Sequence, residues 1–224
     1  MRALRLLCFL LVSMSLACAA LPIQSNVWMP ATPTPQMQVA SSGSVLFQDD
    51  FSRPVTGWEH LQAEQGSMDY DGGGYRILVN ALETNFWSTP HQDFADVHLE
   101  VDVGKLAGPD ENRIGLICRF TSSDYYFFMI TSDGFYGIGI FAAGQAALLG
   151  QSELQSSEKI LKGMAVNHLR ADCVGDMLAL HVNGFEIASV HDQTLKSGDI
   201  GLLAGTFGQP GVDVIFDNFV ALQP

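Results

Sequence analysis

From about residue 45 onward, the chain is a succession of short segments in which apolar and polar residues alternate. In 97–103, for example, Val97, Leu99 and Val101 alternate with histidine and carboxylate residues. Successive side chains of a strand point to opposite faces, so a period of two predicts half-buried β-strands. Comparable strand-like runs occupy 45–47, 75–79, 113–120, 125–131, 135–142, 168–173, 177–182, 185–190, 200–204 and 212–222.

Turn signals separate these runs. Asp-Gly at 133–134, Gly-Asp at 175–176 and Asn-Gly at 183–184 each lie between two strand-like segments, and predict tight hairpins. Only 152–163 suits a helical turn, and weakly. Many short strands with regular turns are typical of a sandwich or barrel, so we predict one all-β domain at 45–224.

The N-terminal 44 residues have a different composition. Arg2 and Arg5 precede an apolar run and then small residues, a pattern that describes a secretory signal peptide at 1–18. The apolar run is too short to span a bilayer as a helix. Residues 19–44 are rich in Pro, Thr, Ser and Gln, and predict a disordered linker.

Cys18 lies in a setting that resembles a bacterial lipoprotein cleavage site, in which this cysteine becomes the lipidated first residue. The match is incomplete, because Ser15 stands where such a site has an aliphatic residue. The alternative is ordinary cleavage after Ala19 or Ala20. Lipidation would give a cell-surface protein tethered to a membrane, and ordinary cleavage a secreted one. Both predict an extracytoplasmic protein.

The charge of the chain excludes some partners. Its formal net charge is −13, and removal of Arg2 and Arg5 with the signal peptide would make it −15. A protein this acidic is repelled by nucleic acids and by anionic lipid headgroups. We therefore expect no nucleic-acid partner, and membrane association only through a lipid on Cys18.

Two of the four cysteines, Cys118 and Cys173, lie in the β-patterned region. In an exported protein we expect them to form a structural disulfide, which would need their strands to be neighbours or to face each other. By chain entropy such a bond would contribute on the order of 4 kcal/mol to stability. The alternative is a pair of small buried hydrophobic side chains. No His or Cys has the spacing for a metal site with either of them.

A family resemblance rests on the order of several segments. They are DF at 50–51, GLICR at 115–119, YYF at 125–127, DGFY at 133–136, NHLRA at 167–171, LHVNG at 180–184, GDIGL at 198–202 and FDNFV at 216–220. This succession resembles the jelly rolls of concanavalin A-like lectins and glucanases. It is similar to bacterial extracytoplasmic domains of the 3-keto-disaccharide hydrolase (DUF1080) group and to laminin-G-like domains. The resemblance covers 45–223 and implies a jelly-roll β-sandwich, but the fold hosts lectins, hydrolases and inert modules alike.

The strongest catalytic candidate is the pair Glu100 and Asp102, whose side chains share one strand face. Retaining glucanases of this fold use a Glu-x-Asp-x-(x)-Glu strand, in which the last Glu is the general acid. Here Gly104 and Lys105 stand where that acid should be. We therefore predict no catalysis by this pair, and interpret it as acidic decoration of a solvent-facing strand.

Calcium is a candidate cofactor, because sandwich domains often bind it where the first and last strands meet. Asp49, Asp50 and Asp217 lie on segments that can pair there. Ca²⁺ needs six to eight oxygen ligands, so backbone carbonyls would have to complete the site. The alternative is that these residues end strands and cap turns.

Carbohydrate binding needs an exposed aromatic ring with planar polar groups beside it. The aromatic candidates are Trp58, Trp87, Tyr70, Tyr125 and Tyr136, and their polar neighbours are Arg119, Asn85 and Asp124. Trp58 follows a glycine and Trp87 precedes Pro90, so we expect these two to be exposed in loops.

The sequence thus predicts a non-catalytic extracytoplasmic β-sandwich module that binds carbohydrate or a cell-envelope partner. One alternative is a glycoside-processing hydrolase or lyase of the 3-keto-disaccharide hydrolase type. Another is a structural module for protein–protein interaction. An enzyme would show convergent carboxylates or a metal in a cleft, and a lectin would show exposed Trp or Tyr at a shallow groove.

Overall fold

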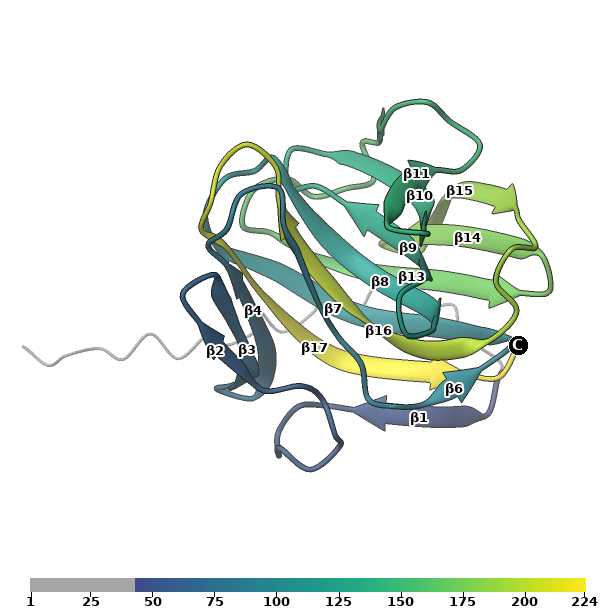
Figure 1. Ribbon diagram of the computed structural model, residues 1–224, viewed down its shortest axis with the longest axis horizontal. Helices are drawn as coiled ribbons and strands as arrows, with labels where there is room; N and C mark the ends of the chain where they lie inside the picture. Colours follow the sequence, from purple (N-terminus) through teal and green to yellow (C-terminus); the bar gives the residue numbers. More distant parts are fainter. Residues whose placement is uncertain (1–42) are drawn as a thin grey trace, which may run out of the picture.

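A computed structural model describes residues 43–224. The predicted signal peptide, Cys18 and almost all of the predicted linker lie outside the described residues. Within 43–224, every regular element is a β-strand, and none of the residues described there forms a helix long and apolar enough to cross a membrane. The strands form two antiparallel sheets stacked as layers (Figure 1).

Sheet A has the strand order β15-β14-β13-β7-β17-β4-β3-β2, and β1 pairs with the C-terminal half of β17 (Figure 1). Its strands are β1 (Val45–Asp49), β2 (Leu61–Ala63), β3 (Gly66–Asp71), β4 (Gly74–Val79), β7 (Val97–Ala107), β13 (Val166–Val174), β14 (Met177–Val182), β15 (Phe185–His191) and β17 (Val212–Leu222). The first and last strands are therefore hydrogen-bonded neighbours.

Sheet B has the order β11-β10-β9-β8-β16-β5, with β12 paired to β10 and β6 paired to β16. Its strands are β5 (Asn85–Ser88), β6 (Asp93–Phe94), β8 (Asn112–Phe120), β9 (Tyr125–Ile130), β10 (Phe135–Ala142), β11 (Gln145–Leu148), β12 (Gln155–Ser156) and β16 (Gly198–Thr206). Neighbours in the sheet are often distant in sequence, which is typical of jelly rolls and Greek keys.

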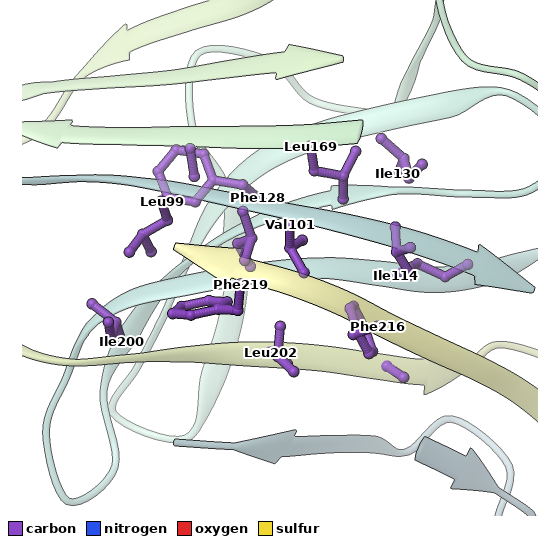
Figure 2. Close-up of a cluster of buried hydrophobic side chains, with 14 of the residues drawn as sticks. Leu99, Val101, Ile114, Phe128, Ile130, Leu169, Ile200, Leu202, Phe216 and Phe219 are labelled. Atoms are coloured by element: carbon purple, nitrogen blue, oxygen red, sulfur yellow. The ribbon is translucent and has the colours of Figure 1, made fainter. Parts of the chain in front are cut away.

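The hydrophobic core lies between the two sheets. Figure 2 shows it formed by Leu99, Val101, Leu169, Phe216 and Phe219 of sheet A and by Ile114, Phe128, Ile130, Ile200 and Leu202 of sheet B. Burial of each such side chain contributes about 1.5–3 kcal/mol to the free energy of unfolding. The sum of these contributions over the core is the dominant stabilising term. Because alternate residues of each strand point into this core, the residues between them must point outward.

The predicted strands and hairpins are confirmed. Each strand-like run of the sequence coincides with a strand, and the three predicted turns join β9 to β10, β13 to β14 and β14 to β15. At the third turn, Asn183 and Gly184 have φ of 52° and 83°, the left-handed conformation that a two-residue hairpin requires. The weak helical turn at 152–163 is wrong, because this segment contains the short strand β12 and turns instead. The short strands β2, β6 and β12 have too few residues to show a period of two.

The predicted disulfide is present and joins the two sheets. Cys118 of β8 and Cys173 of β13 are bonded, are fully buried, and are 55 residues apart in sequence. Cys118 pairs with a residue of β9 in sheet B, and Cys173 with residues of β7 and β14 in sheet A. The bond therefore links the sheets covalently across the core.

Replacement of both cysteines, Cys118→Ala with Cys173→Ala, should lower the free energy of unfolding by about 4 kcal/mol. The reason is that the closed loop restricts the unfolded chain. Urea unfolding of the mature protein measures this as a lower midpoint, and reduction of the wild type in the same assay should shift the midpoint in the same direction. An unchanged midpoint in the double variant would contradict a structural role for the disulfide.

Candidate functional site

The two outer faces of the sandwich differ in chemistry. The outward residues of sheet B include a cluster of aromatic and aliphatic side chains that is separate from the main core. The outward residues of sheet A are mainly histidines, carboxylates and two arginines, Arg76 and Arg170, which are joined by hydrogen bonds and ion pairs. A ligand that stacks on an aromatic ring would thus bind sheet B, whereas a ligand bound mainly through several charged groups would bind sheet A.

Four rings from four strands form what we call the aromatic group: Trp87 of β5, Phe120 of β8, Tyr125 of β9 and Phe141 of β10. The ring centroid of Trp87 is 5.9 Å from that of Tyr125 and 6.3 Å from that of Phe120. Tyr125 stacks on Phe141 at 5.3 Å. Trp87 is 38 % exposed, while Tyr125 is buried below the other rings. The group therefore holds the indole of Trp87 in contact with solvent on a rigid aromatic base.

A polar pair lies beside the aromatic group. Arg113 of β8 donates from Nη1 to Oδ1 of Asn85 at 3.0 Å, and its guanidinium lies 4.0 Å from the ring centroid of Phe207. The pKa of Tyr125 is raised, because the effect of burial is larger than the opposite effects of the Asn85 amide and the Arg113 charge. The phenol, the amide and the guanidinium are therefore close together on the outer face of sheet B.

At the other side of the aromatic group, Phe120 borders a shallow hollow of about 480 Å³. The hollow is lined by Asp93, Phe120, Thr121, Ser122, Ser197, Gly198 and Asp199. The Asp199 carboxylate is fixed by the backbone N–H groups of Gln92 at 2.7 Å and Ile200 at 2.8 Å. Carboxylate and hydroxyl groups beside an aromatic ring are the groups that hold sugar hydroxyls.

Of the residues proposed for sugar binding, the structure brings together Trp87 and Tyr125, with the polar neighbour Asn85 beside Tyr125. The expectation that Trp58 is exposed is wrong: it is 2 % exposed, and its indole Nε1 donates to Asp49 at 3.0 Å. Tyr136 pairs with Ile130 and packs on the main core, so it lies on the inner side of sheet B. Neither side chain belongs to the face that carries Trp87.

Arg119 is also a buried residue, with 1 % exposure. Its φ of 52° and a register irregularity between β8 and β16 turn it out of the strand alternation. Its guanidinium donates to the backbone carbonyls of Ala95, Leu195 and Gly175 at 2.8–3.0 Å. Arg119 thus holds three loops together and is not available to a ligand. A local distortion of this kind leaves no signal in the strand pattern.

The predicted calcium residues lie near the paired ends of β1 and β17. Asp49 is buried and accepts from the Phe51 N–H at 2.8 Å, the Trp58 indole and the Thr56 hydroxyl, so it acts as a structural anchor. Burial and the charges of Asp102 and Asp50 raise the pKa of Asp217. Among residues 43–224, no group of three or more His, Cys, Asp or Glu side chains is arranged to hold a metal ion. Calcium binding therefore gains no support from the geometry and stays a prediction.

The carboxylate pair of β7 belongs to the charged network of sheet A. Asp102 lies 2.8 Å from His168 Nδ1 and accepts from Asn218 at 3.0 Å, and Glu100 lies 3.6 Å from Arg170. Burial would raise the pKa of Asp102, but the hydrogen bonds from His168 and Asn218 hold it below its usual value. Both carboxylates are thus charged partners of neighbouring side chains, on the sheet opposite to the aromatic group.

A second part of this network is centred on Asp172. Its carboxylate lies 2.6 Å from His98, 3.1 Å from His181 and 2.7 Å from Arg170 Nε. Burial would raise the pKa of Asp172, but the hydrogen bonds from His181 and Arg170 hold it far below the usual range. The arrangement stabilises the ionised carboxylate, so it is suited to structural pairing rather than to proton transfer.

Comparisons with known proteins identify the type of fold. No protein-family model and no curated protein matches the chain. Among solved structures, the carbohydrate-binding module CBM66 from Bacillus subtilis superposes with a TM-score of 0.61 at 15 % identity, covering 75 % of this chain and 96 % of that one. The chain therefore has a jelly-roll β-sandwich fold similar to that of this module. The resemblance stated from the sequence is thereby confirmed for the fold.

Two further neighbours of the jelly roll differ in description. A Bacillus subtilis protein of unknown function with a galectin-like fold matches with a TM-score of 0.59 at 13 % identity, over 81 % of this chain and 96 % of that one. A family 16 endo-glucanase from Bacteroides ovatus matches with a TM-score of 0.57 at 12 % identity, over 80 % of this chain and all of the enzyme. At such low identity these likenesses show the fold alone.

Several residues of the site were not singled out from the sequence. Phe120 and Phe141 complete the aromatic group, and Arg113, whose guanidinium lies over the Phe207 ring, provides a cation beside it. Alternation along β8 contained a signal for one of them: Ile114, Leu116 and Cys118 point inward, which places Arg113 outward.

The His168–Asp102 pair should make stability depend on pH. The hydrogen bond to Asp102 raises the pKa of His168 above its usual value of 6.5, although the side chain is partly buried. A raised histidine pKa stabilises the fold below the unfolded value and loses this contribution as pH rises through the folded value. The free energy of unfolding should therefore decline between about pH 6 and about pH 8, and His168→Gln should decline less.

Urea unfolding at both pH values measures this difference. Asn218→Gly is a matched control: it removes the other hydrogen bond to Asp102, adds no titratable group, and suits the φ of 55° at that position. It should keep the wild-type decline. An equal decline in the wild type and in His168→Gln would contradict the pairing.

Proposed function

We propose that this protein is a non-catalytic carbohydrate-binding module that holds a glycan on the outer face of sheet B. The observation that carries this proposal is the partly exposed indole of Trp87, held on Tyr125 and Phe120 beside fixed polar groups. The C–H face of a sugar ring stacks on such an indole, and sugar hydroxyls take the adjacent hydrogen-bonding groups.

The polar groups stand on both sides of the ring. Asp93, Asp199 and several hydroxyls line the hollow next to Phe120, and Asn85 and Arg113 lie on the opposite side. A glycan of more than one sugar would cross Trp87 between them. The names of similar folds, a carbohydrate-binding module and an endo-glucanase, agree with this class of ligand.

The absence of catalysis is part of the proposal. Glu100 and Asp102, the pair that shares the Glu-x-Asp pattern of glucanases, lie on the other sheet and are paired with Arg170 and His168. Gly104 follows them where a general acid would be needed. A ligand on Trp87 would therefore be remote from these carboxylates.

We place the protein outside the cytoplasm. The Cys118–Cys173 bond supports this location, because disulfides persist in oxidising compartments. The signal peptide and lipidation of Cys18 belong to the same proposal and concern residues outside the described part. A lipid anchor followed by a linker would hold the domain at a distance from the membrane surface.

Replacement of the exposed indole tests the binding face. Trp87→Ala should weaken glycan binding tenfold or more, because the stacking surface is lost at the centre of the site. The measurement is a glycan array on the mature protein, followed by calorimetry with the best-bound glycan. Phe185→Ala is the matched control, because Phe185 is 51 % exposed on β15 of sheet A and should not affect binding.

Two results would overturn the proposed function. One is a wild-type protein that binds no glycan on the array, which would direct attention to a protein partner. The other is a Trp87→Ala variant that remains folded by circular dichroism and binds as tightly as the wild type.

Lipidation at Cys18 has its own test. In a bacterial host, the wild-type protein should be recovered in the membrane fraction with the mass of a lipid added at its N-terminus. Cys18→Ala should shift it to the soluble fraction, because its tether is removed. An unmodified mature protein that begins at Ala20 or Leu21 would contradict lipidation and support ordinary secretion.

A further inference from the structure

Arg113 differs from every other shielded cation in the described part of the chain. Arg76, Arg119 and Arg170 each lie within 2.6–3.4 Å of a carboxylate, and Lys105 is bonded to Asp110. The remaining lysines and Arg53 are exposed to solvent. Within 43–224, Arg113 alone is both shielded and without an ion pair. The hydrogen bond of its side chain goes to the neutral amide of Asn85.

The backbone explains how Arg113 and Asn85 meet. Gly205 of β16 lies between them, paired with Arg113 on one side and with Asn85 on the other. A Cβ at Gly205 would lie 2.2 Å from Oδ1 of Asn85, so only glycine leaves room for the two side chains to meet across this strand. The ring of Phe207 supports the guanidinium at 4.0 Å. Arg113 is thus held in one position on the outer face.

No carboxylate of residues 43–224 forms an ion pair with the Arg113 guanidinium. Burial lowers the pKa of Arg113, and the charge of the exposed Glu83 offsets this only from a distance. Shielded charges in proteins are normally paired, because desolvation of an unpaired ion is costly. An arginine fork presents parallel N–H donors that match a carboxylate, and Asn85 occupies only Nη1. The remaining donors are suited to a planar anionic group.

We infer that Arg113 binds the carboxylate of an acidic sugar residue, such as a uronic or sialic acid, in the glycan that the aromatic group holds. This inference rests on the proposed function and specifies the ligand class. The direction of the glycan follows from charge. Asp93 and Asp199 in the hollow beyond Phe120 repel a second carboxylate, so the sugar bound there is neutral and the acidic residue lies over Arg113.

The test uses one acidic oligosaccharide identified on the array and its carboxyl-reduced counterpart, which has the same rings without the charge. The wild type should bind the acidic form about tenfold more tightly, as expected for loss of one charge-assisted contact. Arg113→Gln should bind both forms equally, with the affinity that the wild type has for the reduced form. Arg53→Gln, which removes an exposed cation elsewhere, should behave as the wild type.

The outcomes separate this inference from the function on which it rests. Equal binding of the acidic and reduced forms by the wild type, with loss of both in Trp87→Ala, would overturn the role of Arg113 and leave glycan binding intact. Equal or tighter binding of a sulfated neutral oligosaccharide would overturn the assignment to a carboxylate. The wild-type comparison does not depend on the folding of any variant. An array without any bound glycan would overturn both proposals.

Discussion

The packing of sheet A against sheet B is the constraint on which the rest of the structure depends. Each long strand must supply alternate apolar residues to the shared core, and the Cys118–Cys173 bond links the two layers within it. The intervening residues are therefore placed outward in rows, on both faces, whatever their chemistry. The outer faces can consequently differ in residue type without affecting the core that holds their backbones in position.

The residue types on the two outer faces are in fact different. On sheet A, rows of histidines and carboxylates neutralise each other, as Asp172 does between His98 and His181. On sheet B, rings from separate strands lie together, and glycines in the same rows leave space for neighbouring side chains. Gly205 allows Asn85 and Arg113 to meet, and a Cβ at Gly139 would collide with the ring of Phe127. Small residues are therefore as important to the shape of this face as the aromatic ones.

The sequence predicts much of the fold, because alternation and turn chemistry act over a few residues. The strands, the three hairpins, the fold class and the disulfide are all confirmed by the structure. The position of Trp58 could not be predicted in this way, because its burial depends on contacts from β1 and β17, which are distant in sequence. Arg119 is similar: a single left-handed residue turns it inward against loops from three parts of the chain. Trp87 was assigned to the candidate site, whereas its partners Phe120 and Phe141 depend on strand order, which local patterns do not give.

The most direct test of the central claim follows the tryptophan indole N–H signals of the ¹⁵N-labelled mature protein during titration with the glycan that it binds best on an array. Trp87 is exposed on sheet B, whereas Trp58 is buried and bonded to Asp49, so the two indoles report different places in one sample. The account predicts that the Trp87 signal shifts in a saturable way and that the Trp58 signal stays in place. Saturable binding that leaves the Trp87 signal unchanged would contradict a glycan site on the outer face of sheet B.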